Sequence, residues 1–113
     1  MSVKLNTRQV GDVSVVDVAG RITLGEGSSA LRDALREMVN KGQKKILLNL
    51  GEVNYIDSSG IGELVSGFTT VTNSGGQLKL HNLSKRVKDL LQITKLYTVF
   101  DVHDDEAGAI RSF

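Results

Sequence analysis

The stretch Ile56-Asp57-Ser58-Ser59-Gly60-Ile61-Gly62-Glu63-Leu64 lies where a buried strand is expected to give way to a helix. Residues 45–50 form a short apolar run of strand length before it, and apolar residues recur at helical spacing up to Val71 after it. The first turn of a helix carries backbone N–H groups without helical partners, so it attracts anions and oxygen-bearing side chains. We therefore expect a helix over residues 59–71, with Ser58 and Ser59 at its cap.

The polar residues at this helix start exceed what capping requires. Ser and Asp are common N-cap residues because their side-chain oxygens accept from the second or third helical N–H. Here Asp57, Ser58 and Ser59 follow one another, and the glycines after them remove side chains from the approach. With Ser59 as the capping residue, the hydroxyl of Ser58 is left for a partner. The pattern therefore indicates a functional site.

The rest of the sequence alternates strand and helix patterns. Residues 5–10 and 13–18 flank Gly11-Asp12 and predict an opening β-hairpin. The alternation after the hairpin predicts parallel strands joined by right-handed crossovers. We expect a helix from Ser28 or Ser29, the strand 45–50, the helix 59–71, the strand 77–80, a helix capped by Ser84, the strand 99–102 and a polar helix 104–112. The predicted fold class is α/β, one small domain over residues 1–113 with a mixed β-sheet.

Composition excludes several classes of protein. The chain has 113 residues, of which 40% are hydrophobic and 24% charged, as expected for one globular domain. The absence of Cys removes disulfides and thiolate metal sites, and a net charge of +1 offers no broad basic face to nucleic acid. The sequence shows neither a transmembrane run nor a signal peptide. We expect a cytoplasmic protein with no membrane association and no direct nucleic-acid partner.

A glycine-rich stretch raises the question of a dinucleotide cofactor. Gly25-Glu26-Gly27-Ser28-Ser29-Ala30 matches G-x-G-x-x-A and leads into a helix. That fingerprint requires its first glycine at the end of a strand, whereas the preceding strand is expected to end near Val18. We interpret the glycines as a flexible loop before a Ser-capped helix. His81 and His103 show no paired metal-ligand spacing, so the sequence predicts neither cofactor nor metal.

A small serine hydrolase is an alternative of another class. The strand–Ser–helix turn is similar to a nucleophile elbow, and His81 follows a strand expected to end at the same sheet edge as Ser58. The G-x-S-x-G motif is absent around Ser58 and Ser59, and a short chain offers little wall for a substrate pocket. The sequence therefore favours a protein that is not an enzyme.

Several motifs together resemble one family. They are Asp57-Ser58-Ser59-Gly60-Ile61-Gly62, Val18-Ala19-Gly20-Arg21-Ile22 before the first helix, Leu48-Asn49-Leu50, and Gly75-Gly76 before the next strand. Over nearly its whole length the chain resembles the STAS domain family, in particular the bacterial anti-sigma factor antagonists of sporulation and general-stress switches.

The resemblance implies a phosphorylation-controlled switch without a cofactor. In such a switch the unmodified antagonist binds an anti-sigma factor serine kinase and thereby releases a sigma factor. Phosphorylation of the first serine of the motif, here Ser58, ends the interaction, and a PP2C-type phosphatase resets it. Related STAS proteins also serve as modules of stress-sensing or other signalling complexes, which leaves that role as an alternative.

The same resemblance implies a docking surface around the motif. It comprises the motif itself and the loop after the second predicted strand. The expected partner-binding residues are Asp57, Ser58, Ser59, Gly60, Ile61, Arg21, Thr23 and Leu24.

Overall fold

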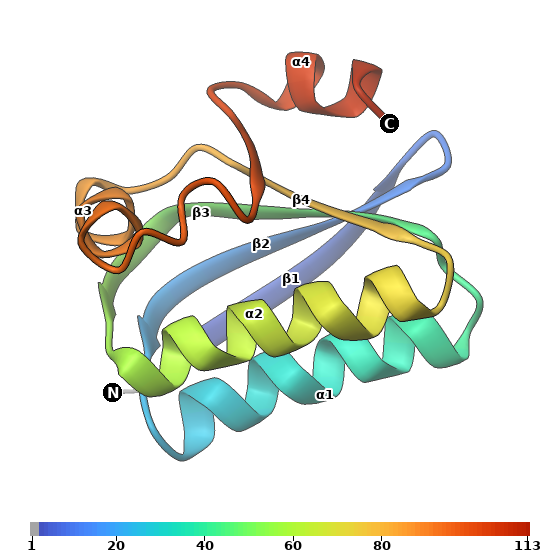
Figure 1. The fold of residues 1–113 in the computed structure, drawn as a ribbon. Helices are drawn as coiled ribbons and strands as arrows, with labels where there is room; N and C mark the ends of the chain where they lie inside the picture. Colours follow the sequence, from blue (N-terminus) through green and yellow to red (C-terminus); the bar gives the residue numbers. More distant parts are fainter. Residues whose placement is uncertain (1–2) are drawn as a thin grey trace.

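The computed structural model describes residues 3–113 and shows a five-stranded sheet with helices on both faces (Figure 1). Strand order is β1-β2-β3-β4-β5; β1 and β2 are antiparallel, and the later strands run parallel. The elements are β1 (Val3–Val10), β2 (Val13–Ile22), α1 (Glu26–Asn40), β3 (Lys45–Ile56), α2 (Ser58–Asn73), β4 (Gln77–His81), α3 (Lys85–Ile93), β5 (Asp101–His103) and α4 (Glu106–Arg111). The predicted hairpin and mixed sheet are confirmed.

Two strands run further than the sequence pattern predicted. β2 continues to Ile22 instead of ending near Val18, and β3 continues to Ile56 instead of Leu50. Polar residues and glycines interrupt the apolar pattern in both extensions, but the strands still pair as far as Ile22 with Ile56. Two register shifts, each with one extra residue in β3, absorb the irregularity, as β-bulges do. Pairing between strands therefore overrides the weak local signal.

The first helix also starts differently from the prediction. α1 begins at Glu26, and no side chain caps it. Gly25 has φ 95° and so makes the turn into the helix, and its C=O accepts the first helical bond from the N–H of Ser29 at 2.9 Å. Ser28 is buried, and its hydroxyl donates to the C=O of Thr23 at 3.0 Å. The predicted Ser cap of this helix is therefore wrong.

The last two elements are shorter than predicted. β5 covers Asp101–His103 instead of residues 99–102, because the N–H of Val99 bonds to the C=O of Leu96 in a turn and pairing with β4 begins at Asp101. Phe100 is buried and packs edge-on against Phe68 of α2. α4 covers Glu106–Arg111 and begins after Asp105, whose carboxylate accepts from the N–H of Gly108 at 2.7 Å. Ser84 caps α3 as expected, accepting from the N–H of Val87.

The main core lies between the sheet and helices α1 and α2, which run side by side along one face of it (Figure 1). Leu31 and Leu35 of α1 and Leu64 of α2 are fully buried there. Gly67 of α2 allows the close approach of the two helices, because a Cβ at this position would overlap Leu35. The core consists of buried aliphatic side chains of the kind that contribute about 1.5–3 kcal/mol each.

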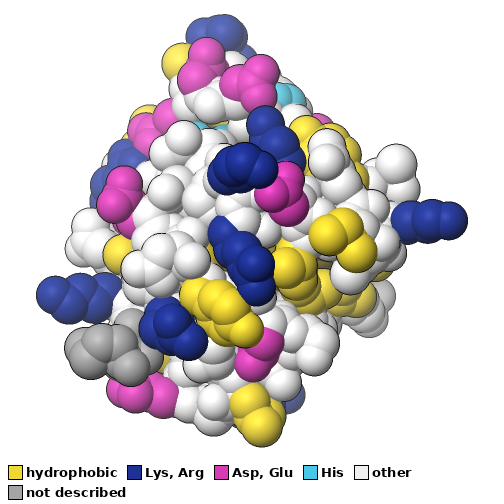
Figure 2. All heavy atoms as spheres, turned by 90° about the vertical axis from the view of Figure 1, so that its left-hand side faces the viewer, with side chains coloured by type: hydrophobic (Ala, Val, Ile, Leu, Met, Phe, Trp, Pro, Cys, Tyr) yellow, Lys and Arg dark blue, Asp and Glu magenta, His cyan; other side chains and the backbone are white. Residues whose placement is uncertain are grey.

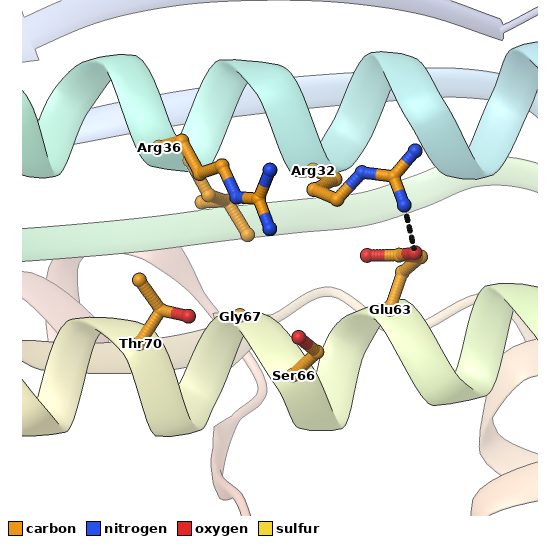
Figure 3. A pocket seen from close by; sticks show the side chains of 7 residues that line it. Arg32, Arg36, Glu63, Ser66, Gly67 and Thr70 are labelled. Carbon is orange, nitrogen blue, oxygen red and sulfur yellow. Dashed lines mark hydrogen bonds and ion pairs between the residues drawn. The ribbon is translucent and has the colours of Figure 1, made fainter.

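An ion pair and a narrow hollow mark the other side of this helix contact. Arg32 of α1 reaches across to Glu63 of α2 with an Nη1–Oε2 distance of 3.3 Å (Figure 3). The hollow beside the pair has a volume of about 10 Å³, which is room for about one water molecule. The α1–α2 contact is therefore packed and offers no space for a substrate.

Along the described part of the chain, no helix combines the length and the apolar character needed to cross a lipid bilayer.

Candidate functional site at the start of helix α2

The ends of β2 and β3 bring the predicted site residues together. Arg21 pairs with Tyr55 and Ile22 with Ile56, so both strands end at the same level. The chain continues from Ile56 through Asp57 directly into α2. The N–H of Asp57 donates to the C=O of Ile22 at 3.3 Å, which fastens the start of α2 to the end of β2.

Asp57 is the N-cap of α2. Its Oδ1 accepts from the N–H of Gly60 at 2.9 Å, and its Oδ2 accepts from the N–H of Leu24 at 3.1 Å. These bonds, first that from Gly60, hold the pKa of the Asp57 carboxyl below its usual value. The prediction that Ser59 caps the helix is therefore wrong, because the carboxylate just before the helix already takes the N–H that a cap would use. The Asp57 side chain therefore joins α2 to the β2–α1 loop.

Replacing Asp57 is expected to weaken the start of α2 and its attachment to the β2–α1 loop. Asp57→Ala should lower the free energy of unfolding by about 1 kcal/mol, the usual effect of losing an N-cap. Asp57→Asn keeps an oxygen acceptor and should lose less. Because the pKa is lowered in the folded state, the charge-dependent stabilisation is present above the unfolded-state pKa, about 3.9, and is lost as the pH falls. Urea unfolding checks this; equal stability of the Ala and Asn variants at neutral pH would contradict the capping role.

Close backbone packing fixes the position of this helix start. Gly60 is buried, and a Cβ there would overlap the C=O of Ile22 and lie 2.6 Å from Cγ1 of Ile56. Gly27 at the start of α1 is equally close, since its Cβ would lie 2.6 Å from the C=O of Arg21. Gly60 and Gly27 therefore let both helices begin against the end of β2.

Ser58 is the exposed hydroxyl of the site. It occupies the first helical position, immediately after the cap, whereas Ser59 is partly buried. Among residues 3–113 the hydroxyl of Ser58 has no hydrogen-bond partner, since the capping bonds are made by Asp57. An exposed hydroxyl at a helix N-terminus can receive a phosphate, and the helix dipole and the N–H groups of the first turn stabilise the added charge.

A family comparison identifies the fold around this serine. The STAS domain family matches residues 4–109. The chain belongs to the STAS domain family. The anti-sigma-B factor antagonist of Bacillus subtilis (strain 168) is 32% identical to this STAS domain over 111 residues, which is 98% of the chain and 100% of that protein.

Solved structures show the same fold. An anti-sigma factor antagonist from Mycobacterium paratuberculosis superposes with a TM-score of 0.86 at 19% identity, covering 97% of this STAS domain and 92% of that chain. The Bacillus cell fate determinant SpoIIAA in its phosphorylated form has a TM-score of 0.74 at 18% identity, with 97% of this domain and 100% of that chain covered. At these identities the likeness concerns the fold alone.

The expected partner-binding residues of the STAS domain divide by exposure. Ser58, Arg21 and Leu24 are exposed, and Leu24 is 79% exposed although it is apolar. Gly60 and Ile61 are buried, so they shape the helix start instead of offering contact surface. Asp57, Ser59 and Thr23 are partly buried. The eight predicted residues therefore lie around one helix start, and three of them are exposed to solvent.

Two residues of this region were not predicted from the sequence. Tyr55 lies under the guanidinium groups of Arg21 and of Arg86 from α3. No motif singles out Tyr55, because the segment before Asp57 reads as loop, and Arg86 is distant in the sequence. The extension of β3 brings them beside the site.

His81 does not join Ser58, which removes the basis of the hydrolase alternative. His81 pairs with Asn49 of β3, and Asn49 precedes Ile56 by seven residues, about 23 Å of extended strand. β4 ends at His81, whereas β3 continues to Ile56. His81 and Ser58 therefore do not meet at one edge of the sheet. Nor do three His, Asp or Glu side chains within residues 3–113 converge as a metal site.

His81 is instead a buried group below α4. It is 4% exposed, and neither ring nitrogen has a hydrogen-bond partner among the described residues. Its Nε2 lies 3.9 Å from Oε1 of Glu106, whose carboxylate accepts from Arg8. Burial lowers the pKa of His81, and the charges of Glu106 and Asp17 oppose this shift only in part.

This burial predicts a loss of stability under mildly acidic conditions. An unfolded His takes up its proton near pH 6.5, whereas the buried ring resists it, so the free energy of unfolding should fall as the pH drops below about 6.5. The slope from one proton is at most about 1.4 kcal/mol per pH unit. Urea unfolding of the wild type and of His81→Phe between about pH 7.5 and 5.5 measures it. Identical slopes for the two proteins would show that His81 is not responsible.

Proposed function

We propose that this STAS domain is an anti-sigma factor antagonist that acts as a phosphorylation-controlled protein–protein switch in the cytoplasm. The observation that carries the proposal is the exposed Ser58 hydroxyl at the start of α2, left free because Asp57 makes the capping bonds. The match to the B. subtilis anti-sigma-B factor antagonist over the length of both chains supports the same role.

In its unmodified form the domain binds an anti-sigma factor serine kinase and so releases a sigma factor, without contacting DNA itself. The docking surface is centred on Ser58 and Leu24 and bordered by Arg21. An exposed apolar side chain next to a polar helix start is a suitable anchor for a protein partner. Asp57 holds the loop of Leu24 against α2, so the two parts of the surface keep a fixed relative position.

The kinase transfers the γ-phosphoryl group of ATP to the Ser58 hydroxyl, with ADP as the leaving group and the hydroxyl proton passing to the kinase. The phosphate adds about −1.5 to −2 charges at pH 7. This charge is compatible with the free helix start, but in an interface it must lose its hydration and stand next to the Asp57 carboxylate. A PP2C-type phosphatase hydrolyses the phosphoserine and restores binding.

Phosphate mapping tests the function. Incubation of the purified domain with an extract of its host cells and ATP should add one phosphate, seen by intact mass, and fragment ions should place it on Ser58. Ser58→Ala should remain unmodified, while Ser59→Ala, the matched control one residue away, should still be phosphorylated. Phosphate on Ser59, or on neither serine, would defeat the assignment.

A further inference from the structure

Within residues 3–113, α4 covers one end of the sheet face opposite α1 and α2. There α4 packs through Ala109 onto Val13, Val15 and Leu47 (Figure 1). Towards the ends of β2 and β3, Arg21 and Tyr55 occupy positions next to the core residues Ile22 and Ile56. Since neighbouring strand residues point to opposite faces, Arg21 and Tyr55 lie on this face.

Two arginines share the ring of Tyr55 at this place. The guanidinium carbon of Arg21 lies 4.5 Å from the ring centroid, and that of Arg86, from α3, lies 4.8 Å from it. Both arginines are exposed, whereas Tyr55 is partly buried. A guanidinium held over a ring by a cation–π contact keeps N–H donors with which it can bind an anion.

These two charges lack an acidic counterpart in the described chain. No ion pair within 4.0 Å joins Arg21 or Arg86 to a carboxylate of residues 3–113, Glu52 and Asp57 on the neighbouring backbone included. Like charges gathered around one ring repel each other, so an anion close to both of them is favoured. Figure 2 looks onto the ends of β2 and β3 and the start of α2, and in its middle Lys and Arg side chains lie beside hydrophobic side chains and some Asp and Glu.

We propose that Arg21, Tyr55 and Arg86 form a docking surface for an acidic protein segment with two neighbouring carboxylates. Guanidinium edges bind carboxylates in a bidentate manner, and Arg and Tyr are residue types that dominate binding energy at protein interfaces. A nucleic acid fits less well, because its affinity depends on many phosphate contacts and the net charge of the chain is only +1. The surface shares Arg21 with the docking surface proposed for the kinase, but it adds Tyr55 and Arg86 and does not depend on phosphate at Ser58.

A titration with an acidic peptide tests the surface. A synthetic peptide of alternating Glu and Asp, added to the isotope-labelled protein, should shift the NMR signals of Arg21, Tyr55 and Arg86 in a saturable way. The variant Arg21→Gln/Arg86→Gln should weaken binding at least about fivefold, as expected for two exposed charge pairs. Lys88→Gln, which removes one charge from the exposed side of the same helix, should bind like the wild type.

Three outcomes would overturn the proposal. One is the absence of saturable shifts at the three residues. Another is an equal loss of affinity in Lys88→Gln, which would show attraction by net charge alone. A third is tighter binding of a single-stranded DNA oligonucleotide to the same residues, which would assign the surface to nucleic acid. Because Arg21 and Arg86 are exposed, thermal melting of the double variant should match that of the wild type, so the test does not depend on folding.

Discussion

Phosphorylation of Ser58 is expected to lower the affinity for the partner kinase by roughly tenfold to a hundredfold while hardly changing the melting temperature. A buried charged or polar group without a partner destabilises an interface by about 1–3 kcal/mol or more, which corresponds to that loss of affinity. The same phosphate meets the N-terminus of α2 in the free protein, where negative charge is favourable. Binding should therefore fall while the fold remains.

Calorimetric titration of the kinase with both forms of the protein, together with thermal melts, measures the two effects. Ser58→Ala should bind and resist inactivation, and Ser58→Asp should show a weaker effect because it carries less charge than phosphoserine. The unphosphorylated and phosphorylated structures of SpoIIAA both have the fold of this chain, with TM-scores of 0.73 and 0.74. Equal affinities, or a large drop in melting temperature, would exclude this mechanism.

The sequence was sufficient for the order of the strands and helices and for the position of α2. Apolar periodicity located α2, and the polar run at residues 57–59 located the exposed serine. These signals are local, since each depends on spacing within one element or one turn. The prediction of a free Ser58 hydroxyl came from the same stretch, but it assumed that Ser59 caps the helix, whereas Asp57 is the cap.

Features that depend on contacts between elements were not predictable from the sequence. Asp57 caps α2 through the N–H of Gly60, and it also accepts from the N–H of Leu24, which comes from a loop 33 residues earlier. β3 reaches Ile56 because β2 pairs with it through a bulged stretch, and that extension brings Tyr55 under Arg21. The sequence prediction placed His81 at the same sheet edge as Ser58. This was wrong because β4 is short and ends beside Asn49.

Gly60→Ala is expected to lower the free energy of unfolding by about 1–3 kcal/mol, the usual effect of overpacking a tight site. The new Cβ would overlap the C=O of Ile22, and backbone cannot yield as the end of a flexible side chain does. α2 would have to move away from β2, against the bonds that Asp57 makes to Ile22 and Gly60. Thermal melting should register a decrease of roughly 4–12 °C.

Gly62→Ala, two residues further along the same helix, is the matched control and should have the opposite effect. A Cβ at Gly62 meets nothing within 4 Å, so only the better helix propensity of Ala counts, and stability should rise by about 0.5–1 kcal/mol. The two substitutions are chemically identical and differ only in what the added methyl group meets. If both raise the melting temperature, the close contact at the end of β2 does not position α2; opposite signs show that Ser58 is held in place by the packing of Gly60 against Ile22.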